Sequence, residues 1–242
     1  MTADEACGAG WRALCVHGAG AGGWEWQAWR RVFEAHGIDV STPDLVAAEA
    51  GLAATRVADY RNQVAAHARA SVASSAPLAL IGASLGGLLA LSVAAEVGAA
   101  ALVLVNALPP AGIVAMPVVA HTAIVPWGSR RSLASTRRAL PDADDATALH
   151  AFRRWRDESG TVLDEARAGI AVDRPSCPVL VLSSEHDDEV PPLASRALAV
   201  RLGADFESLR GASHVGPLLG VGAAATAARV VAWLRALAPG TG

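Results

Sequence analysis

Short apolar runs alternate with longer amphipathic segments along most of the 242 residues. Five runs are apolar at successive positions, as strands covered on both faces are, and a sixth is mixed. Segments long enough for helices lie between and after them. This order predicts an α/β fold, with a mostly parallel sheet of about six strands and helices on both faces. The runs are Ala13–Val16, Ile38–Thr42, Leu78–Ile81, Ala101–Val105, Val179–Leu182 and Asp205–Leu209, and the helical segments are Trp26–His36, Ala58–Ser74, Leu85–Val97, Pro192–Leu202 and Pro217–Leu237.

One long interval departs from this alternation. Residues 107–174 contain no clear strand run, yet they are too many for a plain loop. We expect a core domain built from residues 1–106 and 175–242, with residues 107–174 forming a helical lid that is inserted after the fourth strand. Helical patterns occur in this interval at Arg130–Leu140, Asp144–Asp157 and Val162–Ile170.

Composition narrows the class of protein. Apolar residues make up 52% of the chain, which is enough for one sizeable core. The net charge is −3 and no basic stripe is visible, so we expect no nucleic-acid partner. The three cysteines, Cys7, Cys15 and Cys177, are odd in number and widely spaced, which argues against a disulfide framework.

Two further features bear on where the protein acts. Residues 1–10 show no signal-peptide pattern, and the apolar stretch Pro77–Leu91 is interrupted by glycines and a serine. That stretch is also shorter than the ~18 residues that a membrane span needs. We therefore expect a cytoplasmic protein, monomer or homodimer, that acts on a small molecule and has no membrane partner.

The strongest chemical signal is the run Gly82-Ala83-Ser84-Leu85-Gly86, which follows a strand run and precedes a helical pattern. It matches the G-x-S-x-G turn that exposes a nucleophilic serine at the top of a sheet. Glycines are needed there because side chains would clash across so sharp a turn. Backbone N–H groups at the start of the helix can also stabilise a developing anion. Ser84 is therefore the candidate nucleophile.

A second glycine-rich turn, His17-Gly18-Ala19-Gly20, ends the first strand run. Such a turn can aim a backbone N–H at the oxygen that becomes negative when Ser84 attacks a carbonyl. We expect the N–H groups of Ala19 and Leu85 to form this oxyanion hole. His17 is interpreted as structural, with its ring bonded to nearby backbone.

Acidic residues crowd the segment after the fifth strand run. Ligands bind at the carboxyl ends of parallel strands, so a carboxylate placed there can reach a reacting group. Asp187, Asp188 and Glu189 are all candidates for a catalytic acid, with Glu185 less well placed. At least two of these residues belong to a solvated loop.

The candidate base is His214, in the short turn Gly211-Ala-Ser-His214 that follows the last strand run. The chain order of serine, acid and histidine is the one that this class of hydrolase uses. No other histidine lies three or four residues from another, so we predict no metal site, and the chemistry needs no cofactor. The other histidines are His17, His36, His67, His121, His150 and His186.

Together these motifs resemble the α/β-hydrolase superfamily, in particular its lid-bearing branch of small serine esterases, over Trp11–Leu237 apart from the lid. The run His17–Trp26 is similar to the opening of plant methylesterases and hydroxynitrile lyases. In that family the acid stands four residues before the first proline of its segment, which implies Asp187 rather than Asp188. The resemblance thus implies a Ser84–His214–Asp187 triad that works through an acyl-enzyme.

The sequence departs from the family in two places. About a dozen residues precede the first strand run, so the family's first two antiparallel strands are expected to be missing. Asn106 stands where some relatives place the acid, and an amide cannot serve as that acid, which strengthens Asp187.

Candidate substrate contacts are bulky side chains near the strand ends or in the lid, although such residues often fill cores instead. They favour a small to medium, mostly apolar ester, lactone or thioester. The candidates are Trp24, Met116, His121, Trp127 and Trp155.

Two other functions stay open on the same fold. The first is non-hydrolytic chemistry, such as that of a lyase or a biosynthetic cyclase. Hydroxynitrile lyases also need a lysine near the lid, and this chain contains no lysine. The second is ligand binding on an inactive scaffold, which an apparently intact triad disfavours.

Overall fold

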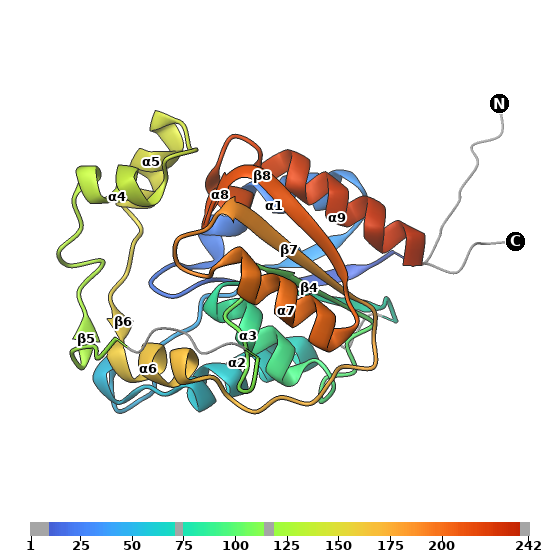
Figure 1. The fold of residues 1–242 in the computed structure, drawn as a ribbon, viewed down its shortest axis with the longest axis horizontal. Coiled ribbons are helices and arrows are strands. Elements are labelled where there is room, and N and C mark those ends of the chain that lie inside the picture. The colour runs from blue at the N-terminus through green and yellow to red at the C-terminus, as the bar shows by residue number, and fades with distance from the viewer. Residues whose placement is uncertain (1–9, 71–74, 114–118, 238–242) are drawn as a thin grey trace, which may run out of the picture.

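The computed structural model describes residues 10–70, 75–113 and 119–237. Its centre is a six-stranded sheet in the order β2-β1-β3-β4-β7-β8, and every neighbouring pair is parallel (Figure 1). The predicted α/β architecture and all six predicted strands are confirmed. The strands are β1 (Arg12–Val16), β2 (Asp39–Ser41), β3 (Leu78–Ala83), β4 (Ala101–Val105), β7 (Val179–His186) and β8 (Asp205–Ser213).

Helices cover both faces of the sheet (Figure 1). One face packs against α1 (Gln27–Ala35), α8 (Gly216–Leu219) and α9 (Ala223–Leu237), and the other against α2 (Val57–Ala70), α3 (Leu85–Val93) and α7 (Pro192–Leu202). Strands β3 and β4 are buried along their whole length, which explains why their sequences are apolar at every position. Two short 3-10 helices, η1 (Gly23–Trp26) and η2 (Leu52–Ala54), lie in the connections.

The last predicted helix is interrupted. Residues 217–237 divide into α8 and α9, and Gly220 and Gly222 lie in the break. Glycine is a poor helix former because its backbone loses the most freedom on folding. The apolar periodicity continues across the break, which is why the pattern predicted a single helix.

Residues 107–174, which were expected to form a lid, connect β4 to β7, and this segment is called the insertion below. The described part of the insertion contains three helices, α4 (Leu133–Ala139), α5 (Asp145–Phe152) and α6 (Gly160–Ala168), and each overlaps one of the predicted helical patterns. It also contains a small antiparallel sheet that the pattern did not predict, between β5 (Ile124–Val125) and β6 (Glu158–Ser159). Strands of two residues are too short to show an alternating pattern.

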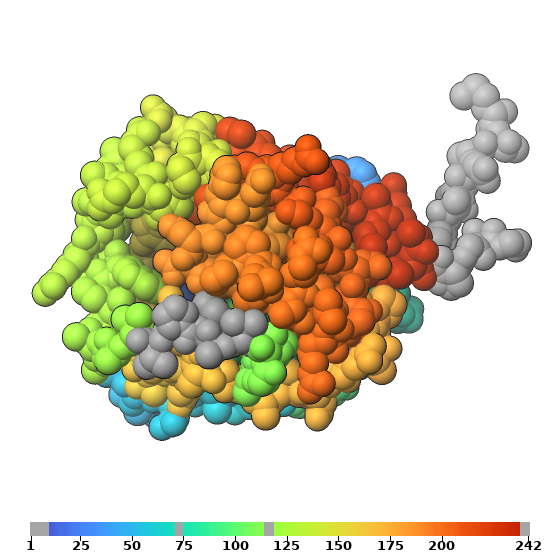
Figure 2. All heavy atoms as spheres, in the orientation of Figure 1, coloured from blue at the N-terminus to red at the C-terminus, as the bar shows by residue number. Residues whose placement is uncertain are grey.

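The insertion packs into both layers of the core. Leu140 and Ala151 join the cluster that contains α1 and α9, whereas Val162 and Ala166 join the one that contains α2 and α3. Figure 2 shows the insertion as a lobe beside the segment that follows β7, with a hollow between the two. In the part of the chain that the structure describes, no helix is long and apolar enough to cross a membrane.

Cys15 and Cys177 are both free thiols, and Cys7 lies outside the described residues. Burial raises the pKa of the Cys15 thiol far above its ordinary value. Cys15 therefore packs as a small apolar residue in the sheet.

Candidate active site

The register of the sheet brings the predicted site residues to one edge. Val16 of β1 lies opposite Gly82 of β3, and Ala83 lies opposite Val105 of β4. The residues that follow these strands therefore emerge side by side at the carboxyl edge. Ligands bind at this edge in open α/β sheets.

Ser84 occupies the sharp turn from β3 into α3. Its backbone has φ 52° and ψ −120°, a conformation that L-residues rarely adopt. The turn requires glycine nearby: a Cβ on Gly82 would lie 2.2 Å from the Gly86 carbonyl oxygen, and one on Gly86 would lie 2.2 Å from the oxygen of Val16. The predicted elbow geometry is thus present, and it holds the serine at the start of a helix.

The His214 ring is hydrogen-bonded to Asp187. Its Nδ1 lies 2.9 Å from Oδ1 and 2.8 Å from Oδ2 of that carboxylate, whose side chain is fully buried. Asp187 Oδ1 also accepts the backbone N–H groups of Glu189 and Val190. These bonds fix the carboxylate, and the carboxylate holds the ring with Nε2 available for a proton.

Of the other acids in this segment, Asp188 and Glu189 line the pocket described below without bonding to His214. Glu189 instead pairs with Arg167, and Glu185 accepts the backbone N–H of Gly211. The structure therefore brings Asp187, and none of its acidic neighbours, to the histidine.

Asn106 holds the histidine turn from the other side. It follows β4 with φ 45°, a left-handed conformation that asparagine tolerates better than most residues. Its Nδ2 donates to the His214 carbonyl oxygen at 2.6 Å and to Ser184 Oγ at 2.8 Å, while its Oδ1 accepts the Ser184 N–H. The residue that stands in the acid position of some relatives is here a link between β4, β7 and His214.

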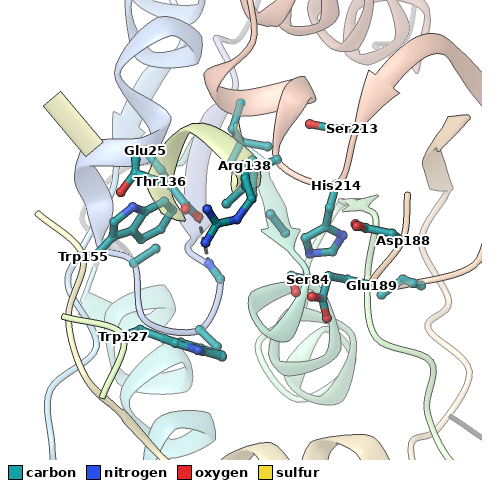
Figure 3. A pocket seen from close by; sticks show the side chains of 18 of the residues that line it. Glu25, Ser84, Trp127, Thr136, Arg138, Trp155, Asp188, Glu189, Ser213 and His214 are labelled. Carbon is teal, nitrogen blue, oxygen red and sulfur yellow. Dashed lines mark hydrogen bonds between the residues drawn. The ribbon is translucent and has the colours of Figure 1, made fainter. Parts of the chain in front are cut away.

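Ser84 and His214 line one cavity of about 390 Å³ under the insertion. Figure 3 shows them on one wall, with Trp127 and Trp155 on the other side. Among the hydrogen bonds of the described residues, none joins the Ser84 hydroxyl to the His214 ring. Catalytic hydrogen bonds are often long before substrate binds, so this geometry fits a nucleophile and base that tighten around a substrate.

Of the predicted oxyanion donors, Ala19 lines the same cavity and Leu85 directly follows Ser84. In the hydrogen bonding of the described residues, the N–H groups of Ala19 and Leu85 have no acceptor. A Cβ on the neighbouring Gly18 would lie 3.5 Å from the Cβ of Ser84, which shows how closely this turn approaches the serine. Two unpaired N–H groups beside a serine can stabilise an oxygen that becomes negative.

His17 has the structural role expected of it. Its Nε2 accepts the Leu45 N–H at 2.9 Å, so its Nδ1 carries the proton and donates to the Gly18 oxygen at 2.8 Å. Burial, with Arg156 nearby, lowers the pKa of His17 to about 4. The ring is therefore neutral and belongs to the framework of the turn.

Glu25 is a buried carboxyl group that the sequence did not single out. It lines the cavity, and its Oε1 accepts the Gly18 N–H at 2.8 Å. Burial raises its pKa to about 7, and the hydrogen bond from Gly18 and the nearby His214 and Arg156 oppose this rise. The position of Glu25, directly between Trp24 and Trp26 in the run that carries the resemblance, was the available signal.

The predicted substrate contacts divide into three groups. Trp127 and Trp155 line the cavity. Trp24 and His121 do not: Trp24 packs edge-on against Trp155 with ring centroids 5.2 Å apart, and His121 bonds to Asp164. Met116 lies outside the described residues.

Two other groups that organise the site come from the insertion and had no sequence signal. Asp142 accepts both the hydroxyl and the N–H of Ser213, the residue before His214. Glu158 accepts the N–H of Gly20, the residue after Ala19. The sequence could not single out these two acids, because each lies in a segment with many polar residues and its hydrogen-bond partner is distant along the chain.

Among the described residues, no group of three or more His, Cys, Asp or Glu side chains is arranged to hold a metal ion. The cavity's polar groups are those of hydroxyl residues, two histidines and several charged side chains. Arg131, Arg138 and Arg167 of the insertion all line it, so its wall is more polar than the sequence suggested.

Comparison with known proteins identifies the family and the fold of the chain. A family model described as the alpha/beta hydrolase family matches residues 13–232. A metagenome-derived lipolytic enzyme is 21% identical, with 95% of each chain covered and a TM-score of 0.71. A methylesterase from Arabidopsis is 14% identical over 93% of this chain and 99% of its own, also with a TM-score of 0.71.

A pyrethroid hydrolase from Sphingobium faniae is 18% identical, with 96% of this chain and 98% of its own covered and a TM-score of 0.69. At these identities the structural likeness establishes a shared fold. No curated protein matches the sequence.

Proposed function

The chain belongs to the alpha/beta hydrolase family, and from this premise we propose that it is a serine hydrolase of carboxylic esters, lactones or thioesters. The observation that carries the proposal is the hydrogen bond between the buried Asp187 and His214, which lines the same cavity as the strained Ser84. A fixed carboxylate, an oriented imidazole and a serine that lines the substrate cavity are the parts that acyl transfer needs.

In the proposed mechanism, His214 Nε2 takes the proton of the Ser84 hydroxyl while Ser84 Oγ attacks the substrate carbonyl. Asp187 keeps the imidazole in the required tautomer and stabilises its charged form. The N–H groups of Ala19 and Leu85 bind the oxyanion. His214 then gives its proton to the leaving alcohol or thiol, and a water that it activates hydrolyses the acyl-enzyme.

The cavity limits the substrate to a small or medium-sized molecule, since about 390 Å³ lies near the lower end of the range for ligand pockets. Trp127, Trp155, Leu108 and Leu163 give it apolar surface. Arg138 also reaches into it (Figure 3). We therefore propose a mostly apolar acyl or alcohol group and a place for one polar substituent beside Arg138.

Hydrolysis of p-nitrophenyl acetate and butyrate tests the proposal, with wild type compared with Ser84→Ala. We expect turnover that the variant lacks, together with one covalent fluorophosphonate adduct on the peptide that contains Ser84. A wild-type protein that neither turns over these esters nor takes up the fluorophosphonate would contradict the proposal.

A further inference from the structure

Buried carboxylates hold the turn that carries Ala19 on both sides. The Gly18 N–H donates to Glu25 Oε1 at 2.8 Å, and the Gly20 N–H donates to Glu158 Oε2 at 2.9 Å. Glu25 and Glu158 are only 3% and 4% exposed. The N–H of Ala19 lies between these two occupied donors and has no acceptor among the described residues. The turn therefore leaves the Ala19 N–H unpaired, while the N–H groups of Gly18 and Gly20 on either side are held by hydrogen bonds.

Glu158 comes from β6 of the insertion, 138 residues from Gly20 along the chain. Its other oxygen, Oε1, accepts the Tyr60 hydroxyl at 2.9 Å and the Ser159 N–H at 2.8 Å. A buried carboxylate with both oxygens bonded has one favoured orientation, because leaving either oxygen unpaired is costly. Glu158 thus joins the turn, helix α2 and its own strand rigidly.

Arg156, two residues before Glu158, is hydrogen-bonded to the same turn. Its backbone N–H donates to the Gly20 oxygen at 2.8 Å, and its Nε donates to the Ala21 oxygen at 2.5 Å. Its Nη2 lies 3.2 Å from His17 Nε2. The segment 156–158 therefore contacts the turn at residues on both sides of Ala19.

We propose that Glu158, together with Arg156, positions the Ala19 N–H as an oxyanion donor, so that the insertion completes the oxyanion hole. This inference rests on the proposed function. Both are positioning residues, because they act on the reacting atoms through the turn. An oxyanion donor works only when its direction is fixed before the reaction, and a displacement of about 1 Å can cost about 100-fold in rate.

The same segment links the hole to the substrate. Trp155 directly precedes Arg156 and lines the cavity. Trp127 packs over the turn so closely that a Cβ on Gly20 would lie 2.6 Å from its ring. A substrate seated against these two tryptophans would therefore contact the same segment that holds the turn.

The test is the variant Glu158→Gln. In either orientation of the amide, its NH₂ group faces a fixed backbone N–H, of Gly20 or of Ser159, so one contact becomes donor against donor. We expect kcat for p-nitrophenyl butyrate to fall about 100-fold while KM changes less than about twofold. Affinity for a trifluoromethyl ketone, which forms a tetrahedral oxyanion on the serine, should fall in parallel with kcat/KM.

Glu165→Gln is the matched control. Glu165 also belongs to the insertion and accepts a core backbone N–H, that of Val57, at 2.9 Å, but it lies on α6 and does not line the cavity. It should leave kcat within about twofold of wild type. A wild-type kcat in Glu158→Gln, or equal losses of kcat in both variants, would overturn the inference.

Amide hydrogen exchange separates this inference from the proposed function. Exchange in the peptide that contains Gly18–Ala21 should accelerate in Glu158→Gln and not in Glu165→Gln, whether or not any ester is hydrolysed. Unchanged exchange would show that Glu158 does not hold the turn. If Glu158→Gln does not fold, Arg156→Lys replaces it: lysine lacks the two guanidinium donors, and we expect a kcat loss of about tenfold with the same constant KM.

Discussion

The insertion contacts the turn at Ala19 and the loop at His214 through two acids that differ in burial. Glu158 is 4% exposed and holds Gly20, next to Ala19, the proposed oxyanion donor. Asp142 is partly exposed and holds Ser213, next to His214, with 2.6 Å to the hydroxyl and 2.9 Å to the N–H. The two contacts are of the same kind: in each, one acid of the insertion accepts a hydrogen bond from the residue next to a proposed site residue.

The difference lies in what else holds each loop. His214 is also fixed by Asp187 through its ring and by Asn106 through its carbonyl oxygen, so Asp142 is one support among three. The turn at Ala19 is held by Glu25, Glu158 and Arg156, and two of these three, Glu158 and Arg156, belong to the insertion. Water can also replace the partly exposed carboxylate of Asp142 as an acceptor, whereas the buried Gly20 N–H would stay unpaired without Glu158. The insertion therefore matters more to the turn at Ala19 than to the loop at His214.

The largest expected effect tests the strongest support of the histidine loop. Asp187→Asn should lower kcat about 10,000-fold, because the imidazole then adopts the wrong tautomer. Asp188→Asn, next to it and exposed, should lower kcat by less than about threefold. Steady-state hydrolysis of p-nitrophenyl butyrate measures both, and the reverse ranking would show that the acid is assigned wrongly.

The second prediction concerns Glu25, the buried acid that accepts the Gly18 N–H in the turn at Ala19. Burial raises the pKa of Glu25 from 4.5 to about 7, so the folded protein binds more protons than the unfolded chain between these values. The free energy of unfolding should therefore fall by about 3 kcal/mol as the pH rises from 4.5 through 7, at 1.36 kcal/mol per pKa unit. Urea denaturation across this range measures it.

Glu25→Gln is the control for that pH dependence. The amide oxygen can still accept the Gly18 N–H, but the side chain no longer titrates. The decline in unfolding free energy above pH 4.5 should be much smaller in this variant. Equal slopes in the two proteins would mean that Glu25 is ionised in the folded state throughout.

A smaller effect is expected at the third support of His214. Asn106→Ala removes the bond to the His214 carbonyl oxygen and both bonds to Ser184. We expect kcat to fall about tenfold, because each lost hydrogen bond contributes about 1 kcal/mol and the ring stays bonded to Asp187. The fall should leave KM unchanged; a kcat equal to that of wild type would show that Asp187 alone fixes the ring.

The smallest effect should come from Asp142→Ala. Solvent can hydrate Ser213 once the carboxylate is gone, so kcat should fall by no more than about threefold. This variant is compared with Glu158→Gln in the same assay. A loss at Asp142 as large as that at Glu158 would break the comparison on which this account of the insertion depends.

The sheet could be predicted because buried parallel strands must be apolar at nearly every position, as β3 and β4 are. Ser84, His214 and the acidic segment at Asp187 could be singled out because each follows a strand, and strand ends meet at one edge. The choice of Asp187 within that segment came from the resemblance to the family. The glycines around Ser84 had a steric reason that can be read from residue type alone.

Other parts of the site were beyond a pattern. Trp24 and His121 were expected at the substrate, but residue type does not say which neighbour a ring contacts: Trp24 packs on Trp155 and His121 bonds to Asp164. Glu158 and Asp142 bond to residues on distant parts of the chain, and no periodicity marks such a contact. These residues needed the folded insertion to be seen.

The most direct test of the central claim is to trap the acyl-enzyme. Wild-type protein would be mixed with p-nitrophenyl butyrate, quenched in acid within the first turnovers, digested and analysed by mass spectrometry. The account predicts one butyryl group on the peptide that contains Ser84, and none in Ser84→Ala. Turnover with no acyl group on that peptide, or with the group on another residue, would contradict it.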